Sequence, residues 1–182
     1  MANLGLMAAT VTDWANALLL EASTADLVAR PGRVVLGNPT VGWDGCCDGV
    51  VGVEMSGFGF AGTNWPNPGT QTVPPFRVDC ADEYWRAEFR VVLLRCVPAF
   101  AEGPDGEQGR APRPEVVNES AVNLQHDAFT VWSALRCSAK AGRLADTGRC
   151  VIGGVSPIAG SGMCAGHSIQ VIARVHDCVE CA

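Results

Sequence analysis

The stretch Tyr84-Trp85-Arg86-Ala87-Glu88-Phe89-Arg90-Val91-Val92-Leu93-Leu94-Arg95-Cys96-Val97-Pro98 decides the fold. Up to Leu93, apolar side chains alternate with charged ones, which is typical of a β-strand with one buried face. Val92 and Leu94 then add apolar side chains to the second face. We therefore expect a strand over Tyr84–Val97 that is central in its sheet at its C-terminal end.

A second block with a cysteine pair at its edge lies upstream, at Trp43-Asp44-Gly45-Cys46-Cys47. It leads into a predicted half-buried strand over Cys47–Ser56, because apolar residues alternate there with other types. The residues expected on its buried face are Val51, Val53 and Met55. A shorter strand is expected before it, at Arg33–Leu36.

The C-terminal third of the chain predicts a hairpin. Its first strand begins in Gly148–Val155, its turn is the Gly-rich segment Gly160–Gly166, and its second strand alternates through to Val175. One face of this last strand carries Ile169, Val171, Ala173 and Val175.

Two segments have helical periodicity. Over Thr10–Ala29 the apolar spacing is three and four residues, with Thr10 or Thr12 as the expected N-cap and Pro31-Gly32 as the stop. Over Glu115–Ala141 the spacing is again four and three, with Gly142 as the expected C-cap. The first stripe is Val11, Trp14, Leu18, Ala22, Ala25 and Val28. The second, which we expect to lie entirely on the sheet, is Val117, Ala121, Leu124, Ala128, Val131 and Leu135, widened by Phe129 and Trp132.

These elements predict an α+β fold: a mixed, mostly antiparallel sheet with two main helices packed on it and long Gly/Pro-rich loops. The 182 residues suit a single domain, 1–182. The long loops are expected at about 57–82 and 98–114, and a short tail at 176–182. Loops of this length inside one domain are usually functional or mobile.

Composition restricts the class of protein. A net charge of −6 and a pI near 5.0 argue against a surface that neutralises nucleic-acid phosphates. The N-terminus lacks the basic region of a signal peptide, and no apolar run reaches the roughly 20 residues that span a bilayer. We therefore expect a soluble protein made in the cytoplasm, with no membrane partner. The nine cysteines are an odd number without a secretion signal, so we expect mostly reduced thiols that pack as small hydrophobic side chains.

One metal-ligand pattern is present, a CxxC formed by Cys178 and Cys181 with His176 nearby. A closed zinc site needs a fourth ligand, and no second paired cluster accompanies this one. Cys46 and Cys47 are too close in sequence for the usual two-ligand knuckle, although folding could bring one of them near the tail. The interpretation adopted is a reduced tail and no metal site.

Other candidate motifs fail on chemistry. The dipeptides His126-Asp127 and His176-Asp177 lack the further ligands of a metal phosphohydrolase. A dyad of Cys164 and His167 needs a geometry that sequence does not supply. Gly160-Ser161-Gly162 matches neither a nucleophile elbow nor a phosphate loop. We expect no enzyme, no catalytic residue and no cofactor. Trp65, among prolines, fits a partner-binding anchor and a side chain folded onto its own domain equally well.

The order of these blocks resembles the tail terminator family of long-tailed, siphovirus-type actinobacterial phages. The resemblance covers most of the chain and is carried by Trp43-Asp44-Gly45-Cys46-Cys47, by Phe89–Pro98, by the helix around His126-Asp127-Ala128, and by the Gly-rich passage before the last strand.

The resemblance implies a structural virion protein at the tail-neck junction. Such a subunit forms a homohexameric ring on the tail tube, ends tube polymerisation and joins the tail to the head-side connector or stopper, while DNA passes through without specific binding. The loops Gly57–Pro75 and Pro98–Pro114 are the expected contact elements. The alternatives are another neck-ring protein, such as a head-to-tail stopper, or a zinc- or thiol-binding module or small enzyme built on Cys178, Cys181 and His176.

Overall fold

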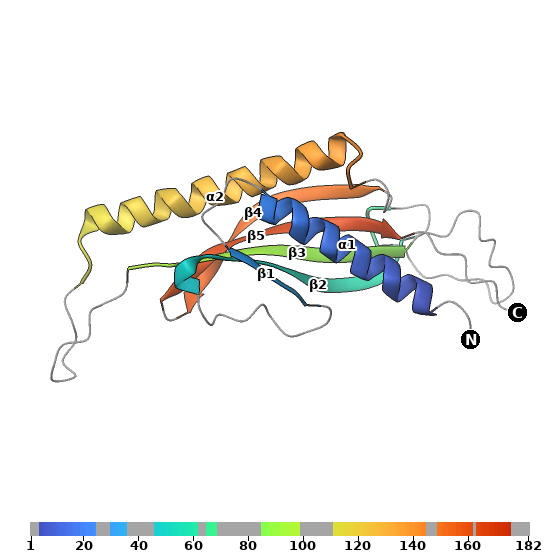
Figure 1. The fold of residues 1–182 in the computed structure, drawn as a ribbon, viewed down its shortest axis with the longest axis horizontal. Helices are drawn as coiled ribbons and strands as arrows, with labels where there is room; N and C mark the ends of the chain where they lie inside the picture. The colour runs from blue at the N-terminus through green and yellow to red at the C-terminus, as the bar shows by residue number, and fades with distance from the viewer. Residues whose placement is uncertain are drawn as a thin grey trace, which may run out of the picture.

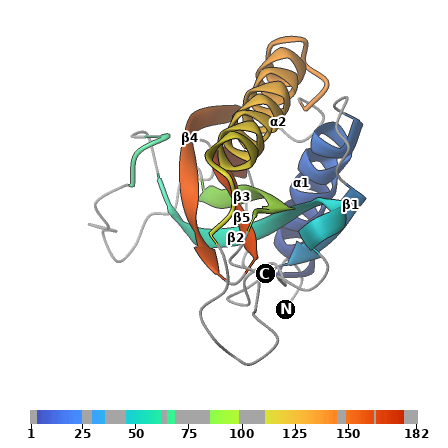
Figure 2. The same ribbon diagram turned by 90° about the vertical axis from the view of Figure 1, so that its left-hand side faces the viewer.

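The computed structural model describes residues 4–24, 30–35, 46–61, 65–68, 85–98, 111–144, 149–161 and 163–175. The elements run in the order α1 (Leu4–Thr24), β1 (Arg30–Val35), the 3₁₀ turn η1 (Cys46–Asp48), β2 (Val50–Phe60), β3 (Trp85–Cys96), α2 (Pro114–Lys140), β4 (Cys150–Ser161) and β5 (Cys164–Val175). The strands form one sheet in the order β1-β2-β3-β5-β4, in which only the β1–β2 pair is parallel. Both helices lie over one face of it, as the two perpendicular views show (Figure 1 and Figure 2). This confirms the predicted α+β fold.

β3 is the middle strand of the sheet, as its sequence predicts. It pairs with β2 on one side and with β5 along its whole length on the other, from Trp85 opposite Val175 to Cys96 opposite Cys164. The predicted alternation decides which face is buried under the helices. The helix-covered face of the three central strands carries the fully buried residues Val51, Val53, Ala87, Phe89, Val91, Ile169, Val171, Ala173 and Val175.

β2 is longer than predicted. The sequence assigns a loop from residue 57, but the strand continues to Phe60, so that assignment is wrong for 57–60. After a register shift between Met55 and Gly57, pairing with β3 resumes. The Phe58 ring stacks on Trp85 with their centroids 5.4 Å apart. Cross-strand pairing therefore overrides the weak strand propensity of the glycines.

The N-terminal boundaries also differ from the prediction. α1 begins at Leu4, so Thr10 and Thr12 lie inside the helix and do not cap it. The residues ahead of Thr10 are largely good helix formers, which explains the earlier start. Pro31-Gly32, predicted to stop the helix, lies within β1, where an edge strand tolerates a missing N–H. The buried stripe of α1 is confirmed for Val11, Trp14, Leu18 and Ala22, while Ala25 and Val28 lie outside the described residues.

The predicted C-terminal hairpin is present, with longer strands and a shorter turn. β4 runs to Ser161 and β5 starts at Cys164, so most of Gly160–Gly166 is strand. At Gly166 the chain passes very close to β3: a Cβ atom there would lie 1.8 Å from the carbonyl oxygen of Leu93. Within the predicted loops, residues 62–64, 69–82 and 99–110 lie outside the described residues, as does the tail 176–182.

α2 has nearly the predicted bounds. Pro114 occupies the start of the helix, where its missing N–H costs nothing, and Gly142 has the positive φ of 73° typical of a residue after a helix end. Ser138, fully buried, ties α2 to α1: its Oγ donates to Glu21 Oε2 at 2.5 Å and accepts from Arg143 Nη2 at 2.9 Å. Neither described helix is long and apolar enough to cross a membrane.

Candidate interaction surface and cysteine cluster

The N-terminal half of α2 extends beyond the end of the sheet (Figure 1). Between Pro114 and His126, every residue is exposed except Ser120 and Leu124, which are half-buried. The prediction that the whole stripe lies on the sheet is therefore wrong for its first half. The stripe is buried only from Ala128 onward. The C-terminal half is held by α1 and the sheet, and the 27-residue helix continues past them.

Uncovered apolar side chains lie on this projecting half and, at Phe129, just after it. Val117 is 42% exposed, Val122 63% and Phe129 58%. Val117 and Ala121 are four residues apart, and Val122 and Phe129 are seven apart, so each pair shares a side of the helix. The two pairs lie on different sides of the helix, and we name the four residues together the free α2 face. Phe129, predicted to widen the buried stripe, belongs to this exposed surface.

Charge is divided along α2. Glu115 and Glu119 lie in the projecting half, whereas Arg136 and Lys140 lie in the half packed on the domain, and all four are exposed. Near the basic end, the Arg136 guanidinium lies 4.6 Å from the centre of the Trp132 ring. An open pocket of about 460 Å³ lies there, lined by Trp132, Ser133, Arg136, Cys137 and Lys140. One half of the helix is thus acidic and apolar, and the other basic with an aromatic pocket.

Two polar contacts fix α2 to the sheet between these halves. Asp127 is buried and forms an ion pair with Arg95 near the end of β3. Trp132 Nε1 donates a hydrogen bond of 2.8 Å to the carbonyl oxygen of Gly153 on β4. The neighbouring His126 is exposed. Within the His126-Asp127 dipeptide, Asp127 therefore forms a structural ion pair with Arg95.

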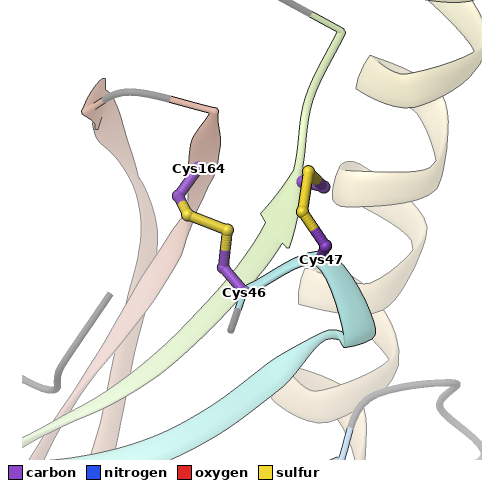
Figure 3. The surroundings of a disulfide bond; sticks show 4 residues. Cys46, Cys47 and Cys164 are labelled. Carbon is purple, nitrogen blue, oxygen red and sulfur yellow. A yellow bond between two sulfur atoms is a disulfide. The ribbon is translucent and has the colours of Figure 1, made fainter. Parts of the chain in front are cut away.

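Four cysteines meet where β3 ends and β5 begins (Figure 3). We name Cys46, Cys47, Cys96 and Cys164 the four-cysteine cluster. In the structure Cys46 is disulfide-bonded to Cys164 and Cys47 to Cys96, with Cα atoms 6.0 Å and 4.1 Å apart. This corrects the expectation of reduced packing thiols for these four. The physical reason is the strand register, which sets Cys96 directly opposite Cys164, next to the turn η1.

The candidate dyad of Cys164 and His167 is not formed. Residues three apart on a strand point to opposite faces, and Cys164 is bonded to Cys46. Burial lowers the pKa of His167, whose Nδ1 is enclosed without a hydrogen-bond partner. Burial likewise raises the pKa of the free Cys150 thiol, which makes it a poor nucleophile at neutral pH.

The remaining candidates divide between the described and undescribed parts of the chain. Trp65 is half-buried with its Nε1 enclosed, and Arg86 donates to the carbonyl oxygen of the next residue, Pro66, at 3.2 Å. This favours a Trp65 side chain folded onto its own domain over a protruding anchor. The tail candidates His176, Cys178 and Cys181 lie outside the described residues.

Comparison of the sequence with protein-family models and with curated proteins finds no match. The free α2 face and the four-cysteine cluster are thus the two candidate functional features of the described residues. Sequence reasoning missed both. The signal for the first is that Val122 and Phe129 are apolar yet lie off the line of the core stripe.

Proposed function

We propose that this chain is a phage tail terminator: a structural virion protein that forms a ring at the tail-neck junction, caps the tail tube, ends its polymerisation and joins the tail to the head-side connector. The observation that carries the proposal is the free α2 face. A long helix that leaves an apolar half uncovered beyond its own sheet suits a subunit that completes its packing in an assembly.

A second copy of the chain is the occupant that suits the free α2 face. The acidic projecting half, with Glu115 and Glu119, is complementary to the basic half, with Arg136 and Lys140, and to the pocket beside Trp132. A contact between two different surfaces of identical subunits is heterologous, and it generates a ring when the rotation closes. The six-fold number follows from the family resemblance alone.

The sheet offers surfaces for the other partners. Among the described strands, β4 pairs only with β5 and β1 only with β2, so each leaves one edge without a strand. Such edges accept a strand from a partner. We assign the tube protein and the head-side connector to these edges and to the connecting segments 61–75 and 98–113. The net charge of −6 would let DNA slide through the ring without sticking.

Two neighbouring substitutions test the ring contact. Val122→Asp places a charge in the free α2 face, whereas Asn123→Asp adds the same side chain at an exposed position on another side of the helix. Light scattering and electron microscopy of the wild type and the Asn123→Asp variant should show rings, and Val122→Asp should give monomers with an unchanged circular dichroism spectrum. Equal assembly of both variants would remove the free α2 face from the contact.

The biological role is tested by adding purified protein to tail tube protein that is polymerising. A terminator is expected to shorten the tubes and to be seen as a ring at one tube end. Binding to the connector without binding to tubes would assign the chain to the stopper position. A monomer with affinity for neither would contradict the proposal.

A further inference from the structure

We propose that the four-cysteine cluster, when reduced, is a structural zinc site. In the structure its sulfur atoms are joined as two disulfides, yet they converge more closely than two independent crosslinks require. The Sγ atoms of Cys46, Cys47 and Cys96 all lie within 4.8 Å of one another. The fourth sulfur, that of Cys164, is bonded to the sulfur of Cys46.

This spacing is close to what zinc needs. A tetrahedral zinc ion with Zn–S bonds of about 2.3 Å holds its sulfur ligands about 3.8 Å apart. Rotation of the cysteine side chains can supply the remaining adjustment once the S–S bonds are broken. Four thiolates are a complete ligand set for a closed structural site, so no water or further residue is required.

The backbone explains why four side chains meet at one point. Cys96 and Cys164 are directly opposite each other on neighbouring antiparallel strands, so their side chains share one face of the sheet. Cys46 and Cys47 come from η1, where consecutive side chains would ordinarily point about 120° apart. Here both nevertheless lie within 4.8 Å of Cys96. The turn thus presents two sulfurs to the two supplied by the strands.

The surroundings suit a soft metal ion. Cys46 and Cys164 are 2% and 8% exposed and pack with Val92, Leu94, Val50 and Ile158. This apolar shell shields one side of the site from water, while the exposed Cys47 leaves a path for the ion to enter. Thiolate ligands select zinc over the hard cations magnesium and calcium.

The two states of the cluster are related by a balanced reaction. A thiol reductant supplies four electrons and four protons to the two disulfides, which gives four thiols. Zinc then binds the sulfurs as thiolates, and the thiol protons pass to solvent. A reducing compartment, in which disulfides rarely persist, favours the zinc form.

The full chain, expressed in a reducing cytoplasm and purified without oxygen in a phosphine reductant, should contain about one zinc ion per chain by elemental analysis. Cobalt(II) added to the metal-free, reduced wild type should give the intense visible absorption of a tetrahedral thiolate site. This measurement needs no variant, so a misfolded mutant does not affect it.

Substitutions then locate the ion. The double variant Cys46→Ser/Cys164→Ser should bind zinc more than about 100-fold more weakly, since losing ligands costs more than losing an outer-shell partner. Cys137→Ser, on the exposed side of α2, and Cys178→Ser/Cys181→Ser should keep the ion.

Three results would overturn the zinc site: folded, reduced wild type that holds no zinc and gives no cobalt spectrum; zinc lost with the tail pair but kept by the double variant; or protein from a reducing cytoplasm that carries both disulfides. None of these outcomes depends on ring formation or tube binding, so the zinc site and the proposed function fail separately.

Discussion

Val117 and Leu135 lie on the same line of α2 but should respond differently to truncation. They are 18 residues apart, five turns of the helix, so their side chains point in the same direction. Leu135 is fully buried, whereas Val117 is 42% exposed on the projecting half. Replacing each residue with alanine and measuring the stability of the monomer therefore tests how far along α2 the sheet supports the helix.

The magnitudes follow from burial. Leu135→Ala removes fully buried carbons and leaves a cavity, at a cost of about 2–5 kcal/mol, which lowers the Tm of a domain of this size by about 4–20 °C. Val117→Ala removes two carbons, and each contributes about 0.8 kcal/mol when it is fully buried. Because Val117 is 42% exposed, the expected loss is only about 0.9 kcal/mol in total. The better helix propensity of alanine offsets about 0.5 kcal/mol, so the Tm should change by less than about 2 °C.

The assay is thermal unfolding followed by circular dichroism, at a concentration where light scattering reports monomers. Under assembly conditions, Val117→Ala should weaken ring formation even though the monomer is unaffected. A monomer destabilised by Val117→Ala as much as by Leu135→Ala would show that the first half of the stripe is covered by the chain itself, and the argument from the free α2 face would fail.

Three further changes test the fold. Gly166→Ala places a Cβ atom against the β3 backbone and should lower the free energy of unfolding in urea by about 3 kcal/mol or more. At Gly154 a Cβ atom would meet nothing within 4 Å, so Gly154→Ala should have a free energy of unfolding within about 1 kcal/mol of wild type. Equal effects of the two substitutions would refute the close approach at Gly166. Ser138→Ala breaks the buried hydrogen bond between the helices and should lower the free energy of unfolding by about 1–3 kcal/mol. Ser133→Ala, at an exposed position of the same helix, should change it little. A neutral Ser138→Ala would mean that the hydrogen bond contributes nothing to stability. Because burial holds the folded-state pKa of His167 below its ordinary 6.5, the unfolded chain takes up the proton first; the unfolding free energy should fall as pH drops below about 6.5 and level off below the folded pKa, and His167→Gln should flatten that slope.

The strands and α2 could be predicted because their pattern and their burial agree. In β3 and β5 the alternating apolar residues are the ones buried under the helices, so the sequence pattern and the tertiary packing favour the same strands. The prediction failed where pairing overrides local preference. Gly57 and Gly59 are typical of a loop, yet they pair with Glu88 and Arg86 in the sheet. At Gly57 a Cβ atom would lie 3.3 Å from the Glu88 side chain, whereas at Gly59 it would meet nothing within 4 Å.

The two functional features depend on information that a sequence pattern does not hold. Periodicity places Val117 and Leu135 on one stripe but cannot say where the sheet ends beneath it. The cysteine pairs join residues 118 and 49 positions apart, and only the strand register brings them together. Both features depend on how helices and strands are placed relative to one another, whereas the sequence pattern predicts only the helices and strands themselves.

The bridge between Cys46 and Cys164 has a mechanical consequence. Of the described elements, α1 and β1 precede Cys46 and β5 follows Cys164, while β2, β3, α2 and β4 lie between them. Tension applied to the two ends of the chain therefore crosses from η1 to β5 through sulfur, and the enclosed elements carry no load. Because the Cys47–Cys96 bridge still spans 49 of the 118 positions between Cys46 and Cys164, breaking that link alone would release about 69 residues, roughly 230 Å of extended chain, into the path of the force.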